Sequence, residues 1–103
     1  MASLHIQHPI TDLPTWVSAF SRFEEKRRLA GVLSETIRHP VDDDRFVVID
    51  LEFETVDQAT GFLQFLESAV WANEESSPAL AGKPDTKILE PVDIAIHGVR
   101  ARR

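Results

Sequence analysis

The 103-residue chain contains no cysteine. Disulfides, thiolate nucleophiles and cysteine-based metal sites are therefore excluded. No apolar run approaches the ~20 residues that a membrane-spanning helix needs. The first residues lack the charged-then-apolar pattern of a secretion signal. The length predicts one globular domain. The absences predict a location in the cytoplasm and no membrane partner.

Basic residues are also scarce, with 11 lysines and arginines against 17 acidic residues and a net charge of -6. Three of the 11 lie in the last four positions: Arg100, Arg102 and Arg103. The rest of the chain is thus strongly acidic, and such a surface repels phosphate backbones, so nucleic-acid binding is not expected. We divide the chain into a domain, residues 1–92, and a C-terminal extension with a basic end, residues 93–103.

The first half of the chain alternates between strand and helix patterns. Residues 3–8 read as a strand, and Asp12 is a suitable N-cap for a helix that continues to about Arg28. Residues 32–39 and 45–53 read as two strands joined by the turn at 40–44, where a proline precedes three aspartates. They are predicted to form a hairpin.

The second half repeats the order helix, then strand. Thr55 and Gln58 form a capping-box pattern that predicts a second helix ending near Ala72. A loop with two prolines follows at 73–85, and the last strand is predicted at 86–92. The order β-α-β-β-α-β predicts a ferredoxin-like α+β fold. Its four-stranded antiparallel sheet has the first and third strands in the middle and both helices on one face.

The central strand, "RFVVIDLEF", has two different faces. We expect one face to pack on the helices: Val47, Ile49, Leu51 and Phe53. The other face carries Phe46 and Val48 together with Asp50 and Glu52. Since the two apolar side chains would be costly to expose as a patch, we expect a second copy of the sheet to cover them. The result would be a homodimeric α+β barrel with a partly polar chamber between the sheets.

Three ionisable side chains are predicted to share that chamber as catalytic residues: His5, Asp50 and Glu52. His5 beside Asp50 would form an acid-base couple, or else a structural pair at the dimer interface. The two carboxylates could hold a divalent metal with His5, but their spacing does not demand it, so no metal site is predicted. Phe46, Val48 and Trp71 are predicted to contact the substrate.

His8, His39 and Trp16 are predicted to have no role in the site. His8 and His39 lie near strand ends and are expected to face solvent. Trp16 continues the apolar stripe of the first helix and is expected in the core. Phe65 lies off the stripe of the second helix and is expected to make an outer contact.

Residues 3–92 resemble the dimeric α+β barrel superfamily, which includes antibiotic-biosynthesis-monooxygenase-like domains and haem-degrading monooxygenases. The resemblance depends on the element order, a tryptophan in the first helix, the "VVIDLEF" strand and "W…SPAL" after the second helix. Haem-degrading members use a strand-one asparagine, a tryptophan and an iron-ligating histidine. Trp71 matches the tryptophan, but strand one has His5, Gln7 and His8 instead of asparagine. The comparison therefore implies no haem, and no cofactor is predicted.

Two functions remain open at this point. The resemblance implies a cofactor-independent monooxygenase, lyase or isomerase that acts on a small apolar or aromatic molecule in the chamber. The alternative is a non-catalytic dimer that binds a small ligand or serves as an interaction module. An open chamber with converging polar groups would favour the enzyme, and a filled one would favour the module.

Overall fold

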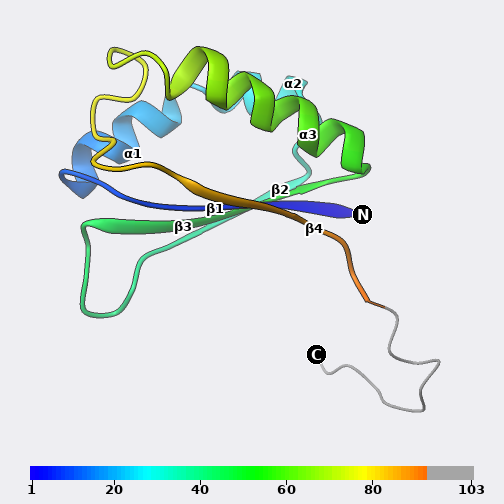
Figure 1. Cartoon of the computed structure of the whole chain (residues 1–103), viewed down its shortest axis with the longest axis horizontal. Helices are drawn as coiled ribbons and strands as arrows, with labels where there is room; N and C mark the ends of the chain where they lie inside the picture. Colours follow the sequence, from blue (N-terminus) through cyan, green and yellow to red (C-terminus); the bar gives the residue numbers. More distant parts are fainter. Residues whose placement is uncertain (93–103) are drawn as a thin grey trace.

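A computed structural model describes residues 1–92 of the chain. The C-terminal extension proposed from the sequence, residues 93–103, lies outside the described residues. The described chain folds as a four-stranded sheet with helices on one face (Figure 1). None of the helices in residues 1–92 is both long and apolar enough to cross a membrane.

The sheet has the strand order β2-β3-β1-β4, and every neighbouring pair is antiparallel. Its strands are β1 (Ala2–Pro9), β2 (Ser34–Arg38), β3 (Phe46–Phe53) and β4 (Asp85–Leu89). The first and third strands are central, as predicted, and β4 is an edge strand that ends before Pro91. The ferredoxin-like α+β arrangement predicted from the sequence is confirmed.

The two central strands bury alternate residues against the helices. The largest fully buried side chains are those of Leu4, Val47, Leu51 and Phe53, all from β1 and β3. Leu4 and Leu51 face each other in the strand register. This alternation gives the sheet one apolar face and leaves the other face to more polar side chains.

The first helical segment is broken rather than continuous. It consists of α1 (Leu13–Ser21), capped by Asp12 as predicted, and α2 (Glu24–Leu29). At the break the N–H of Phe23 donates to Phe20 O, a bond of the tighter three-residue kind. The Arg27 side chain also donates to Phe20 O from Nη1, at 2.6 Å. The Phe20 carbonyl at the C-terminal end of α1 thus accepts hydrogen bonds from Phe23 and Arg27, and these bonds stabilise the break between the two helices.

The second helical segment, α3 (Val56–Phe65), begins with the predicted capping box of Thr55 and Gln58. It continues without a break into a π-helical turn, η1 (Leu66–Val70). Phe65 does not make the expected outer contact but packs against the core, with its ring 5.7 Å from that of Phe62. The sequence prediction missed this because the partner comes from the first helical segment: the ring of Phe23, the N-cap of α2, lies 6.3 Å from the Phe65 ring.

Candidate functional site

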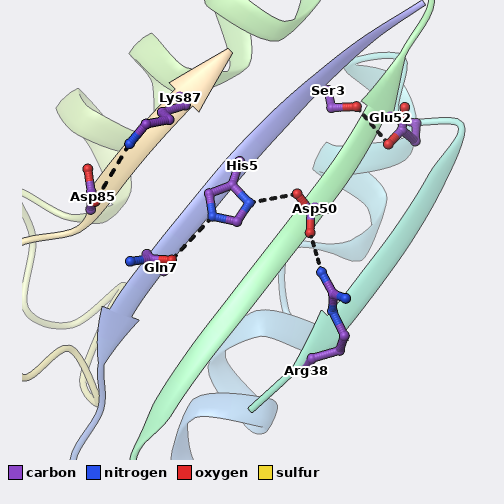
Figure 2. Close-up of polar contacts among 8 residues, drawn as sticks. All are labelled: Ser3, His5, Gln7, Arg38, Asp50, Glu52, Asp85 and Lys87. Carbon is purple, nitrogen blue, oxygen red and sulfur yellow. Dashed lines mark hydrogen bonds and ion pairs between the residues drawn. The ribbon is translucent and has the colours of Figure 1, made fainter. Parts of the chain in front are cut away.

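The sheet face turned away from the helices carries a polar network across three strands (Figure 2). His5 on β1 donates from Nδ1 to Asp50 Oδ1 on β3, at 2.8 Å. The other oxygen of Asp50 accepts from Arg38 Nη2 on β2, at 2.9 Å. His5 Nε2 lies 3.3 Å from Gln7 Oε1. The sequence predicted that His5 and Asp50 would be neighbours, and they are; their role as a catalytic couple stays a prediction.

Glu52 does not join this network. It accepts from the Ser3 hydroxyl at 2.7 Å, further along the same two strands. Within residues 1–92, no group of three or more histidine or carboxylate side chains is arranged to hold a metal ion. The structure therefore brings together two of the three predicted catalytic residues.

The three predicted substrate contacts separate onto different sides of the sheet. Phe46 and Val48 are half-buried on the face turned away from the helices, where Val48 lies opposite Gln7 and Arg38. Trp71 follows η1 on the helix side. The role of these three residues as substrate contacts stays a prediction.

Each chain has a partly open cavity on the helix side, between the sheet and the helices. Its volume is about 60 Å³. An apolar cavity that binds benzene measures about 150 Å³, so this one holds a few waters as it stands, and a ring would enter only if the lining side chains moved apart. Its walls are mainly apolar and aromatic, with few polar side chains: His8, Arg27, Ser76 and Ser77. An apolar cavity with a few converging polar groups is the usual form of a small-molecule site.

His8 lies in the wall of this cavity, which corrects the expectation that it faces solvent. It is 3% exposed, because it follows Leu4 and Ile6 on the buried face of β1. Burial lowers the pKa of His8 below its usual value of 6.5. The Nδ1–H donates to Pro9 O at 3.0 Å, which leaves Nε2 as the unprotonated nitrogen. Nε2 bonds to no described residue.

Two tryptophans hold the imidazole of His8 edge-on. Its ring centroid lies 6.4 Å from that of Trp16 and 6.4 Å from that of Trp71, with interplanar angles of 61° and 69°. Trp16 is buried as predicted, but it also lines the cavity. The neutral, unpaired nitrogen of His8 therefore sits in an aromatic environment.

The π-helical turn η1 positions Trp71. The N–H of Trp71 donates to Leu66 O, five residues back, at 2.7 Å. The extra residue in this turn rotates Trp71 toward the side of Leu66 and Val70, which also line the cavity. Single π-turns of this kind are frequent at functional sites.

Arg27 supplies the one charged side chain among the cavity-lining residues. It is 4% exposed, forms an ion pair from Nε with Glu35, and stacks on Phe20 with 3.6 Å from Cζ to the ring centroid. The Phe20 ring stacks in turn on Trp16, at 4.8 Å. A continuous row of stacked groups thus separates Arg27 from His8.

A shallow groove adjoins the cavity on the outside. Trp71 and Leu80 line both, and Gly82 and Lys83 belong to the groove alone. The two shared side chains form the boundary between cavity and surface, so a ligand larger than one ring would extend into the groove.

Sequence reasoning missed His8 and Arg27, although the signals were present. The alternation of Leu4 and Ile6 assigns His8 to the buried face by position alone. Arg27 lies four residues after Phe23 and seven after Phe20, on the apolar stripe of the helical segment. A polar residue at a position that the pattern requires to be buried is the signal of a site.

No protein-family model and no curated protein sequence matches the chain. Solved structures do match its fold. A cofactor-independent oxygenase of Streptomyces nogalater is 12% identical, with a TM-score of 0.66 over 89% of this chain and 93% of that one. A monooxygenase of Streptomyces coelicolor, solved with nanaomycin D, is 21% identical, with a TM-score of 0.61 over 89% and 88%.

Another match is a dimeric ferredoxin-like protein from an uncultured marine organism. It is 14% identical, with a TM-score of 0.59 over 85% of this chain and 91% of that one. An antibiotic biosynthesis monooxygenase is also among the structures with this fold. The chain therefore has the ferredoxin-like fold of antibiotic-biosynthesis-monooxygenase-like proteins, as the sequence resemblance predicted.

Proposed function

We propose that the protein is a cofactor-independent oxygenase of small aromatic molecules and that the cavity between sheet and helices is its active site. The observation that carries the proposal is the buried His8 in the cavity wall, whose Nε2 bonds to no described residue and whose ring lies 6.4 Å from the rings of both Trp16 and Trp71. The likeness in fold to two oxygenases supports the reaction class. The chamber between two sheets, which the sequence suggested, becomes the dimer interface instead.

His8 is suited to act as the general base. Because burial disfavours its charged form, it is neutral near pH 7 and ready to accept a proton at Nε2. Removing a proton from an acidic CH₂ or OH group on an aromatic substrate leaves an electron-rich anion that dioxygen can oxidise. When O₂ converts a CH₂ group to a carbonyl, the two hydrogens leave with the second oxygen atom as water. The substrate then supplies all the electrons, and no cofactor is required.

The test uses anthrone, whose acidic CH₂ becomes the carbonyl of anthraquinone. One ring would enter the cavity, which must widen from about 60 Å³ to admit it, and the others would occupy the outer groove. The protein, freed of metals with a chelator, should consume one O₂ per anthrone faster than buffer alone and incorporate ¹⁸O from ¹⁸O₂. His8→Gln should lower the rate by about 10²–10⁴-fold, the usual contribution of a general base.

His39→Gln is the matched control. His39 also precedes a proline and also donates from Nδ1 to that proline's carbonyl, but it is exposed. Its loss should leave the rate unchanged. A rate that depends on His5 and not on His8 would move the chemistry to the opposite face of the sheet and contradict the proposal.

The proposed assembly is a homodimer through the sheet face turned away from the helices. Phe46 and Val48 are only half-buried there in one chain, and no described helix covers them (Figure 1). The dimeric ferredoxin-like match supports this assembly. In the dimer, the pair of His5 and Asp50 would lie in the interface.

A further inference from the structure

We propose that the cavity selects aromatic ligands that carry an anionic oxygen group, and that Arg27 binds this group. The inference rests on the proposed function, because it names the ligand class of the same cavity. It goes beyond that function because nothing in general base catalysis by His8 requires a charged substrate.

The hydrogen bonds of Arg27 leave part of its guanidinium available. Nε is paired with Glu35, and Nη1 donates to Phe20 O. Nη2 has no partner among residues 1–92. A guanidinium presents its donors in a fixed plane that matches a carboxylate. Nη2 of Arg27 is therefore available to donate a hydrogen bond to a ligand oxygen.

The charges of the lining residues also favour an anionic ligand. No aspartate or glutamate lines the cavity, and burial keeps His8 neutral, so Arg27 is the one charged side chain in the wall, with its charge partly balanced by the ion pair with Glu35 outside the wall. Glu35 is not among the lining residues and keeps 30% of its side chain exposed to solvent. An anion bound at Arg27 would meet no negative group inside the cavity.

The rings beside Arg27 determine the shape of the ligand. Phe20 and Trp16 stack nearly parallel, with 22° between their planes, and continue from Arg27 toward His8. A flat ring lying along them would have its anionic substituent at Arg27 and its other edge toward His8. Aromatic carboxylates have this form, with the charged group at one edge of the ring.

Benzoate and benzamide are the matched probes, since they differ little in shape but only benzoate is charged. The chain has two tryptophans, Trp16 and Trp71, and both line the cavity. Their two indole N–H signals in NMR spectra therefore report binding directly. Benzoate should bind the wild-type protein about tenfold more tightly than benzamide, as expected for one charge-assisted hydrogen bond.

Three variants test whether Arg27 is the cause. In the double variant Arg27→Met with Glu35→Gln, which avoids leaving the Glu35 carboxylate without its ion-pair partner, the two probes should bind within about twofold of each other. Glu35→Gln alone should keep or increase the preference for benzoate. Arg28→Met removes the same charge from an exposed position on α2 and should change nothing.

Equal binding of the two probes by the wild-type protein would overturn the inference, and so would a benzoate preference that survives in the double variant. Both results would leave the proposed oxygenase intact, since the cavity would still bind rings. If neither probe shifts either indole signal, the cavity accepts no ring, and the proposed function fails together with the inference.

Discussion

Nδ1 of His5 lies 2.8 Å from Oδ1 of Asp50, across the two central strands and on the sheet face that no described helix covers. Arg38 completes the set by donating to the second oxygen of Asp50. Asp50 is therefore paired within one chain, whereas Glu52 accepts only from the neutral Ser3 hydroxyl. A paired polar network is less costly to bury than isolated charges, and so it is compatible with a dimer interface.

The first prediction concerns this interface. Light scattering at micromolar concentration should give twice the chain mass of 11.6 kDa. Val48→Glu should convert the protein to a monomer, because it places an unpaired carboxylate beside Asp50 and Glu52 in the centre of the contact. Val41→Glu, in the exposed hairpin turn, should remain dimeric. A wild-type mass near 11.6 kDa would exclude the dimer.

The second prediction concerns the core of the sheet. Leu51 is 1% exposed in the central strand, so Leu51→Ala should lower the free energy of unfolding by about 2–5 kcal/mol. Val41→Ala removes apolar atoms from a fully exposed side chain and should change it by less than about 0.5 kcal/mol. The two variants are compared by urea denaturation; equal midpoints would contradict the assignment of the buried face.

The fold could be predicted from the sequence because its signals are local and repeated. Alternation assigned His5 and Asp50 to the same face of adjacent strands, and the capping box marked Thr55 as the N-cap of α3. The burial of His8 and Arg27 could have been predicted from their positions in the apolar pattern, but the cavity that they line could not. Its wall depends on Trp71, which a π-turn redirects, and on Arg27, which reaches back across a helix break. Neither departure from regular helix geometry leaves a mark in the spacing of apolar residues.

The third prediction compares two glycines. Gly31 has a φ of 101°, and an added Cβ would lie 2.8 Å from Nε2 of Gln58, the capping-box residue. Gly31→Ala should therefore destabilise the protein by at least about 1–2 kcal/mol. Gly61 lies within α3 with no atom near its missing Cβ, and Gly61→Ala should stabilise by about 0.5–1 kcal/mol. Thermal denaturation should show shifts of opposite sign; shifts of the same sign would contradict the backbone conformation at Gly31.

The last prediction is a pH dependence of stability caused by His8. Its folded pKa is lowered by burial, so between 6.5 and that lower value the unfolded chain binds the proton and the folded chain does not. Stability should therefore fall as the pH drops below about 6.5, by up to about 1.4 kcal/mol per pH unit, until the folded protein also protonates. Asp12 does not contribute in this range, because its pKa is lowered from an already acidic 3.8 by the N–H of Thr15. Urea denaturation at pH 7.5 and pH 5.5 should show a smaller loss for His8→Gln than for the wild type, whereas exposed His39→Gln should lose as much as the wild type. An equal loss in all three proteins would mean that His8 protonates as readily in the folded chain as in water, and its proposed role as a neutral base would have to be abandoned.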